Sequence, residues 1–142
     1  MRKAANILIA IFTVTAFIAC SGANQLSTNP ADIQGDWQLT SMNGSEVQMS
    51  ENYTVSFNTD GTVAGKADCN YFTGQYNAGE EGSLSMNAVA TTKVNCGSNS
   101  SSSDYLNAIS GSQSFQVRGG NTLTLNTGAG ELVFSKVMMG EG

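Results

Sequence analysis

The stretch YTVSFNTDGTV, residues 53–63, decides the fold class because it holds one strand, a turn and the start of a second strand. Tyr53, Val55 and Phe57 alternate with polar residues, and a period of two is typical of a strand buried on one face. The Asp60-Gly61 pair that follows favours a tight turn between antiparallel strands. Residues 58–61 resemble part of a calcium loop but lack its repeated Asp and closing Glu, so we interpret them as turn chemistry alone.

Similar short strands are predicted on both sides of this hairpin. One precedes it around Trp37 and Leu39 and ends at the Asn43-Gly44 turn. The strands predicted after it lie at residues 71–76, 83–86, 89–94, 115–117, 123–125 and 132–134. Because short strands recur about every ten residues between turns rich in Gly and Asn, the sequence predicts a mainly β protein, built as an antiparallel barrel or sandwich.

One short helix is predicted, at Asp104–Ile109. Tyr105, Leu106 and Ile109 share a face at helical spacing, with Ser103 as the expected cap and Gly111 as the expected end. The serine-rich run at residues 98–103 is polar and of low complexity, which predicts an exposed loop. Aromatic residues at alternate strand positions are expected to fill the core: Trp37, Tyr53, Phe57, Phe72, Tyr76, Phe115 and Phe134.

The first 20 residues have the layout of a bacterial lipoprotein signal. Arg2-Lys3 precedes an apolar run, and Phe17-Ile18-Ala19 leads to Cys20. A basic head, an apolar segment and a small residue before the cleavage point are typical of signal peptides, and ending at a cysteine indicates lipid attachment to Cys20. The apolar run is shorter than the roughly 20 residues that span a bilayer, so we expect the mature chain to hang from a membrane. The alternative is a secreted protein with a free Cys20.

Three parts of the chain are therefore predicted. They are a signal peptide at residues 1–19, a lipidated cysteine with a flexible polar tether at residues 20–31, and a folded domain at residues 32–138. Ser21 follows Cys20 where an Asp would indicate retention in the inner membrane of enteric bacteria. We therefore expect the anchor to lie in the outer membrane, with the domain facing the periplasm.

The charged residues argue against several classes of function. Without residues 1–19, four basic residues stand against eleven acidic ones, a net charge of −7. Nucleic acid is a poor partner, because phosphate neutralisation needs clustered Lys and Arg. The chain has no histidine, the commonest general base and metal ligand. We therefore expect no Ser-His-Asp or Cys-His catalysis, no metal, no cofactor and no enzymatic activity.

Cys69 and Cys96 remain as a pair once Cys20 is assigned to the lipid. In an exported protein an even pair favours a disulfide over two buried free thiols, because disulfides persist in oxidising compartments. Closing this loop removes unfolded-state entropy worth roughly 3–4 kcal/mol in the chain model.

The folded part resembles the META domain, the HslJ-like family of small envelope proteins. The resemblance is carried by the strand at Trp37 and by GTVAGKADCNYFTGQY (residues 61–76) and ATTKVNC (residues 90–96), with LTL (123–125) and LVF (132–134) after the helix. It implies a small, mostly antiparallel, barrel-like β fold with one helix. The signature positions are Trp37, Gly65, Cys69, Asn70, Gly74, Tyr76, Thr92 and Cys96. Members of this family are linked to heat shock, novobiocin resistance and, in parasites, virulence, and they supply no catalytic residue to carry over.

Several signature residues have a structural interpretation beside a functional one. Asn tolerates left-handed backbone and bonds local amides, so Asn70 is predicted to organise a bend pinned by Cys69 and Cys96. The functional alternative is a polar ligand at a barrel mouth. Gly65 and Gly74 are predicted to permit bulges or close packing, and Thr91 and Thr92 to cap or bridge strands.

Taken together, these features favour a tethered, non-enzymatic module that contacts envelope proteins and supports the cell under heat or antibiotic stress. The first alternative is a binder of a small apolar ligand, which needs an interior cavity beyond about 300 Å³ lined by Met and aromatic residues. The second is an inhibitor of a foreign hydrolase, with the 98–103 loop as the plug. An uncovered edge strand of a barrel could also pair with another chain, which leaves the oligomeric state open.

Overall fold

Antiparallel pairing links every strand of the computed structural model, which describes residues 25–138. The predicted signal peptide, Cys20 and the first residues of the tether lie outside the described residues. The elements are β1 (Leu26–Ser27), β2 (Gly35–Met42), β3 (Ser45–Glu46), the 3-10 helix η2 (Ser50–Asn52), β4 (Tyr53–Phe57), β5 (Thr62–Ala67), β6 (Asn70–Ala78), β7 (Leu84–Thr91), α1 (Ser102–Ser110), β8 (Ser112–Arg118), β9 (Thr122–Thr127) and β10 (Gly130–Lys136). The predicted mainly β fold with one α-helix is confirmed.

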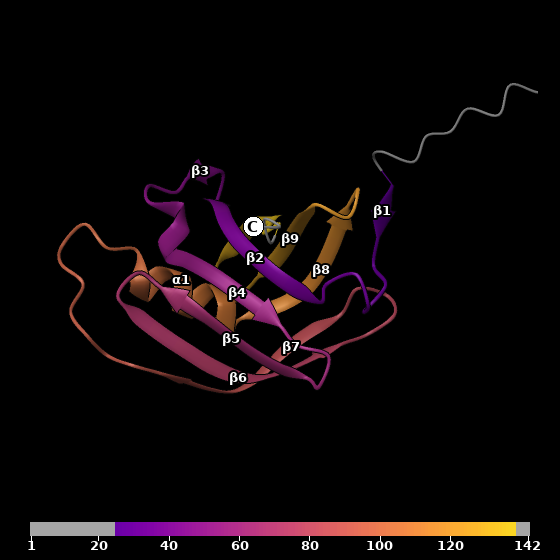
Figure 1. Ribbon diagram of the computed structural model, residues 1–142, viewed down its shortest axis with the longest axis horizontal. Helices are drawn as coiled ribbons and strands as arrows, with labels where there is room; N and C mark the ends of the chain where they lie inside the picture. Colours follow the sequence, from indigo (N-terminus) through magenta and orange to yellow (C-terminus); the bar gives the residue numbers. More distant parts are fainter. Residues whose placement is uncertain (1–24, 139–142) are drawn as a thin grey trace, which may run out of the picture.

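Two meanders make up the sheet (Figure 1). The first runs β2-β4-β5-β6-β7 and the second runs β8-β9-β10, each through neighbouring hairpins. They join where β2 pairs with β10, so strands from the two ends of the domain meet in the middle of the sheet. Two short strands complete it, with β3 paired to β2 and β1 paired to β8.

The hairpin at residues 53–63 forms as its sequence predicts. Tyr53, Val55 and Phe57 are buried and the residues between them are half-buried. The Asn58 N–H donates to Thr62 O and the Gly61 N–H to Asn58 O, a turn in which Gly61 has a positive φ of 85°. The Asp60 carboxylate accepts hydrogen bonds from the Thr62 hydroxyl (2.6 Å) and the Thr62 N–H (2.9 Å). These bonds lower the pKa of Asp60, the bond from the Thr62 hydroxyl more than the bond from the Thr62 N–H. Residues 58–61 therefore form a turn, as the sequence predicts.

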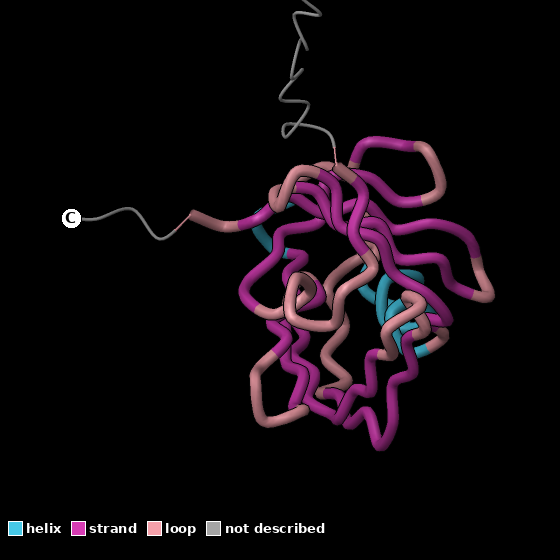
Figure 2. Tube along the Cα trace, turned by 90° about the vertical axis from the view of Figure 1, so that its right-hand side faces the viewer, coloured by secondary structure: helices cyan, strands magenta, loops and turns pink. Residues whose placement is uncertain are grey.

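The sheet curls into a half-barrel instead of closing fully (Figure 2). β7, the strand at one end of the sheet, approaches β8 at a single bridge between Ser83 and Ser114, next to a bond from the Phe115 N–H to Gly82 O (2.8 Å). We call the line between β7 and β8 the seam. Beyond the bridge, α1, which connects the two strands, packs against this seam.

The core lies inside the curl and is filled by large side chains. Trp37, Leu39, Phe115, Leu125 and Phe134 are all fully buried. The helix contributes Tyr105, whose ring packs edge-on against Tyr53 (5.6 Å between centroids) and Phe72 (6.1 Å). All the predicted core aromatics are buried except Tyr76, which is half-buried against Phe57.

Three local predictions need correction. The described part of the expected tether is not all free chain, because Leu26–Ser27 forms β1 and pairs with β8. Helix α1 begins earlier than predicted, with Ser101 and not Ser103 at the N-cap position, and Ser101 makes no side-chain capping bond. The strand expected at residues 89–94 ends at Thr91 as the last part of β7, since the Asn70 side chain takes over the backbone pairing that follows.

Candidate functional site

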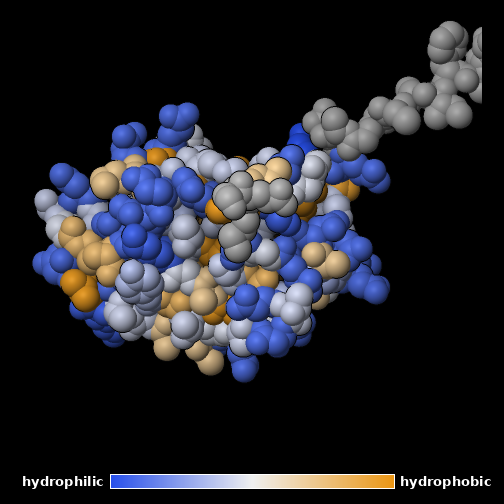
Figure 3. All heavy atoms as spheres, in the orientation of Figure 1, coloured by the Kyte–Doolittle hydropathy of each residue, from blue (hydrophilic) through white to orange (hydrophobic). Residues whose placement is uncertain are grey.

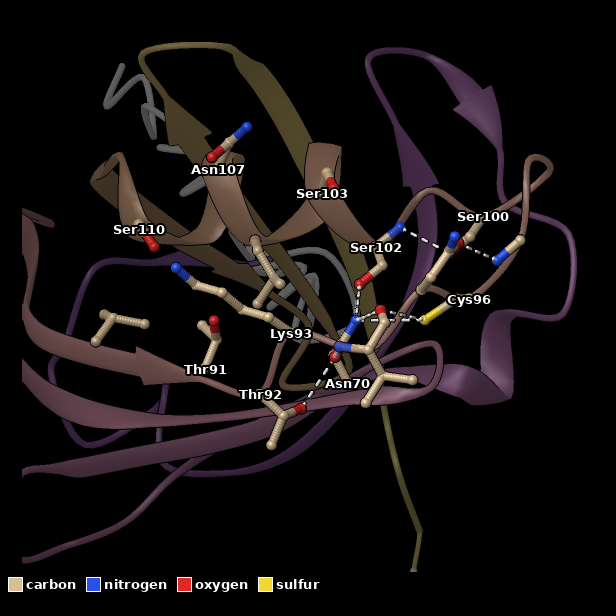
Figure 4. A pocket seen from close by; sticks show the side chains of 15 residues that line it. Asn70, Thr91, Thr92, Lys93, Cys96, Ser100, Ser102, Ser103, Asn107 and Ser110 are labelled. Atoms are coloured by element: carbon tan, nitrogen blue, oxygen red, sulfur yellow. Dashed lines mark hydrogen bonds between the residues drawn. The ribbon is translucent and has the colours of Figure 1, made fainter.

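A groove of about 650 Å³ lies at the seam, outside the filled core. Its walls are the end of β7, residues 92–97 and one face of α1; we call it the seam groove. Fifteen residues line it: Asn70, Val89, Thr91, Thr92, Lys93, Val94, Asn95, Cys96, Gly97, Ser100, Ser102, Ser103, Leu106, Asn107 and Ser110. Figure 4 shows α1 on one side of the groove and the strand bearing Thr91 on the other.

Asn70 closes one end of the groove, where its side chain pairs with backbone groups as a neighbouring strand would. It opens β6 and is buried. Its carbonyl oxygen accepts from the Val94 N–H (2.7 Å) and the Thr92 hydroxyl (3.0 Å). Its amide donates to Val94 O (3.0 Å) and to the Ser102 hydroxyl (3.0 Å). One side chain thus ties β6 to residues 92–94 and to the first turn of α1.

The disulfide reinforces the same end. Cys69 and Cys96 are bonded, as the sequence predicts, over a separation of 27 residues. The Cys69 N–H and the Asn70 amide both approach the Cys96 sulfur at 3.3 Å. Asp68, just before Cys69, has a positive φ of 59°, so the chain bends sharply between β5 and β6. The left-handed residue of the bend is Asp68 and not Asn70, and the hydrogen bonds of Asn70 brace residues 92–96 and Ser102 beside the disulfide instead of the bend itself.

The helix wall follows from the spacing of its residues. Ser103, Leu106, Asn107 and Ser110 recur at intervals of three and four, which places them on one face of α1. Buried Tyr105, Ala108 and Ile109 hold the other face against the core. Lys93 extends along the groove beneath α1 toward Ser110 (Figure 4). It is the one charged residue in the lining, which is otherwise amide, hydroxyl and small apolar groups.

This chemistry suits binding through hydrogen bonds and one positive charge. Within residues 25–138, no three Cys, Asp or Glu side chains gather in a way that could hold a metal ion. The perturbed tyrosines serve the fold: burial raises the pKa of Tyr105 well above its usual value, and its hydroxyl donates to Thr54 O (2.9 Å). Burial also raises the pKa of Tyr76, whose hydroxyl donates to Asn58 O (2.7 Å) in the β4–β5 turn.

The signature residues divide between this site and the sheet. Cys69, Asn70, Thr92 and Cys96 come together at one end of the groove, where Thr92 also accepts from the Tyr71 N–H (2.9 Å). The remaining four serve packing and turns: Trp37, Gly65, Gly74 and Tyr76.

Two of these four, Gly65 and Gly74, are glycines in close contact with neighbouring strands. At Gly65 an added Cβ would meet the Thr54 carbonyl oxygen and Phe72 Cζ, the second at 2.5 Å. At Gly74 it would lie 3.0 Å from Asn87 O, opposite a bulge where Ala88 has a positive φ of 50°. Close packing and a bulge were both predicted for these positions.

The groove itself was not predicted from the sequence. Its lining was interpreted there as a bland serine loop, a strand end and a helix surface, which the bonds of Asn70 to Val94 and Ser102 and the disulfide bring together. The expected exposed loop at residues 98–103 is also shorter than predicted. Ser98 and Asn99 are exposed, but Ser102 is buried in α1 and the Ser101 N–H donates to the Tyr53 hydroxyl (3.0 Å).

Two further surface features complete the description. Hydrophobic residues on the face of Figure 3 appear in separate patches among hydrophilic ones. Within residues 25–138, no helix has the length and hydropathy needed to cross a membrane.

Comparison with known proteins is consistent with this architecture. A family model described as the META domain matches residues 31–138. A protein solved by NMR has 26% sequence identity and a TM-score of 0.61, with 73% of this chain and 90% of that one covered. A Burkholderia xenovorans protein, also solved by NMR, has 20% identity and a TM-score of 0.61, with 79% and 90% covered. A DUF4847 family protein from Bacteroides vulgatus shares the fold at 15% identity and a TM-score of 0.53, with 73% and 93% covered. Among curated proteins, none matches the chain.

Proposed function

The chain belongs to the META domain family, and from this premise we propose that it is a lipid-anchored, non-enzymatic interaction module of the bacterial cell envelope. In this proposal it is an HslJ-like lipoprotein, held through Cys20 in the outer membrane and facing the periplasm. Its role is to contact an envelope protein and to support tolerance of heat or antibiotic stress.

The observation that carries the proposal is the contrast between a filled interior and a braced groove outside it. Trp37, Phe115 and Phe134 occupy the inside of the half-barrel and are fully buried. The seam groove instead opens at the surface, and its walls are held by the disulfide and by the hydrogen bonds of Asn70. A braced surface groove supports contact with a partner, because ordering the site costs little when the partner binds.

The apolar-ligand alternative ranks second. It needs a cavity lined by Met and aromatic residues, whereas the seam groove contains neither. Two further hollows, at residues 26–31 with Glu80 and at the β5–β6 surface, also contain neither. The hydrolase-inhibitor alternative loses support because the end of its proposed plug is the first turn of α1, with Ser102 buried.

The anchor is tested by mass spectrometry of the full-length protein extracted from its own membrane. We expect the mass of residues 20–142 plus a lipid at Cys20, and a Cys20→Ser variant that leaves the membrane fraction. An unmodified Cys20 in a membrane-free protein would overturn the anchor.

The interaction is tested in cells with a photo-crosslinking amino acid at Val94, which is 57% exposed at the groove. We expect one reproducible crosslinked envelope protein. The matched control carries the photo-crosslinking amino acid at exposed Gln116 on β8, and it is expected not to give that crosslinked product. Identical products from both positions would contradict a partner site at the groove.

The stress role is tested by deleting the gene and measuring survival at high temperature and in novobiocin. Survival should fall and return with the wild-type gene, but not with Cys20→Ser if the anchored location matters. Unchanged survival under both stresses would remove this part of the proposal.

A further inference from the structure

We propose that the seam groove binds an extended peptide segment that carries a carboxylate, as an added strand on the free edge of β7. This inference rests on the proposed function, because it names the class of partner that the interaction module takes. The partner is an extended stretch of polypeptide, recognised by its backbone and by one acidic group.

The first step is the free edge. β7 is the last strand of the first meander and pairs only with β6 within residues 25–138, apart from the bridge next to it at Ser83. The Thr92 N–H donates to Tyr71 O, which marks Thr92 and Tyr71 as a hydrogen-bonded pair. Backbone groups alternate in direction along an antiparallel strand, so the N–H and C=O of Thr91 turn away from β6. They face the groove that Thr91 lines and are free to pair with a new strand.

The second step is the shape. Helix α1 lies beside this edge and leaves the groove of about 650 Å³ between them. Leu106 on the helix and Val89 on β7 give apolar contacts, and Ser103 and Ser110 flank them with hydroxyl groups. A strand in such a groove places alternate side chains toward the helix, which gives selectivity beyond the backbone bonds.

The third step is the charge. The chain as a whole carries a net charge of −5, yet the fifteen residues of the groove include no acid and one base, Lys93. Asn and Ser side chains there add hydrogen-bond donors for an anionic group. A carboxylate in the bound segment therefore finds its complement in the groove, while the net negative charge of the chain disfavours a carboxylate placed elsewhere on its surface.

A second copy of the chain fits this edge less well. Helix α1 lies beside the edge in every copy, so two β7 edges meet only if both helices move. An extended segment of another protein that has no flanking helix can pair with β7 without such a movement.

The probe is a phage library of random decapeptides, selected against the full-length chain in detergent micelles. We expect enriched peptides to share an Asp or Glu at a fixed place. Their synthetic versions are then titrated by fluorescence anisotropy. Lys93→Glu should weaken binding about tenfold or more, since it removes a charge-assisted bond and adds repulsion. Arg118→Glu, the same reversal at an exposed site on β8, should change binding less than about twofold.

The backbone part has its own variant. Thr91→Pro removes the outward N–H and should abolish peptide binding, with an unchanged near-ultraviolet dichroism spectrum to show that the fold survives. If that variant does not fold, amide hydrogen exchange on the wild type replaces it, and bound peptide should protect the Thr91 N–H. No enriched peptide, equal affinity of Lys93→Glu and wild type, or an unprotected Thr91 N–H would each overturn the inference.

The result separates this inference from the proposed function. If a partner crosslinks at Val94 but no peptide binds, the interaction module stands and the strand-addition inference falls. If neither occurs, both fall. If sedimentation shows a concentration-dependent dimer through β7 that selected peptides do not displace, a second copy is the occupant and the inference is overturned.

Discussion

Asn70 performs at one position what a further strand would otherwise do. Its side-chain amide forms hydrogen bonds with both the N–H and the C=O of Val94. It also donates a hydrogen bond to the Ser102 hydroxyl in α1. An unpaired buried polar group costs free energy, so each of these bonds matters more than an exposed one would. Local reasoning could propose Asn70 as a bend organiser, but its bonds to residues 24 and 32 positions away needed the structure.

At this scale we predict that Asn70→Asp destabilises the domain by about 2–3 kcal/mol. Aspartate has the same shape but, when ionised, donates no hydrogen bond, so Val94 O and the Ser102 hydroxyl lose their donor. The free energy of unfolding is measured by urea titration at pH 7. Asn77→Asp, exposed on the same strand, is the control and should change it by less than about 0.5 kcal/mol. Equal effects of the two would contradict the role assigned to Asn70.

Tyr105 gives a prediction for pH. Burial raises the pKa of its phenol well above 10, so the folded chain keeps this proton at a pH where the unfolded chain releases it. The free energy of unfolding should therefore fall as the pH rises above about 10, because the unfolded state then binds fewer protons.

The measurement is urea unfolding at pH 9 and at pH 11. Tyr105→Phe should lose about 1 kcal/mol at pH 9, where its bond to Thr54 O is missing. It should also show a smaller fall between the two pH values than the wild type. Tyr71→Phe, at a ring that is 60% exposed, should keep the wild-type fall. A wild-type fall that Tyr105→Phe leaves intact would assign the dependence to other groups.

At the scale of elements, the disulfide connects the β5–β6 bend to the segment that leads into α1. The loop between Cys69 and Cys96 spans 27 residues, and opening it should cost roughly 3–4 kcal/mol. We predict this loss for the double variant Cys69→Ala and Cys96→Ala in urea titration. Reductant should destabilise the wild type by a similar amount and leave the double variant unchanged. A reductant effect that persists in the double variant would point to Cys20 instead.

The close contacts of Gly65 on β5 with its neighbouring strands β4 and β6 give a second prediction at the scale of elements. A Cβ there would press on the Thr54 carbonyl oxygen of β4 and on the Phe72 ring of β6, and the backbone oxygen has little room to move. Gly65→Ala should cost about 1–3 kcal/mol, the usual price of overpacking. Gly128→Ala, whose Cβ would meet only Gln113 at 3.7 Å, should leave the thermal midpoint nearly unchanged. An equal change in both would show that a general effect of replacing glycine by alanine, and not the contact, decides.

At the scale of the whole molecule, local patterns predicted most strands and the helix, because alternation and helical spacing depend on neighbours in the sequence. The pairing of β2 with β10 joins residues about a hundred positions apart, and no local pattern indicates it. The seam groove is built within residues 70–110, where the hydrogen bonds of Asn70 and the disulfide hold β7, residues 92–97 and α1 in one place. The site was therefore predicted only at its cysteines, Asn70 and Thr92.

The arrangement of the sheet leads to a last prediction, for amide hydrogen exchange. β2 and β10 lie in the middle of the sheet, bonded on both sides, so their amides exchange only when the whole domain opens. Leu39 and Phe134, both fully buried there, should be among the slowest. The Thr91 N–H faces the groove at the free edge and should exchange far faster, while the Thr92 N–H, bonded to Tyr71 O, should be slower than Thr91. The contrast between these two neighbours controls for position in the chain. Similar slow exchange at Thr91 and Leu39 would mean that the edge is already covered, and the free strand on which the peptide inference depends would be lost.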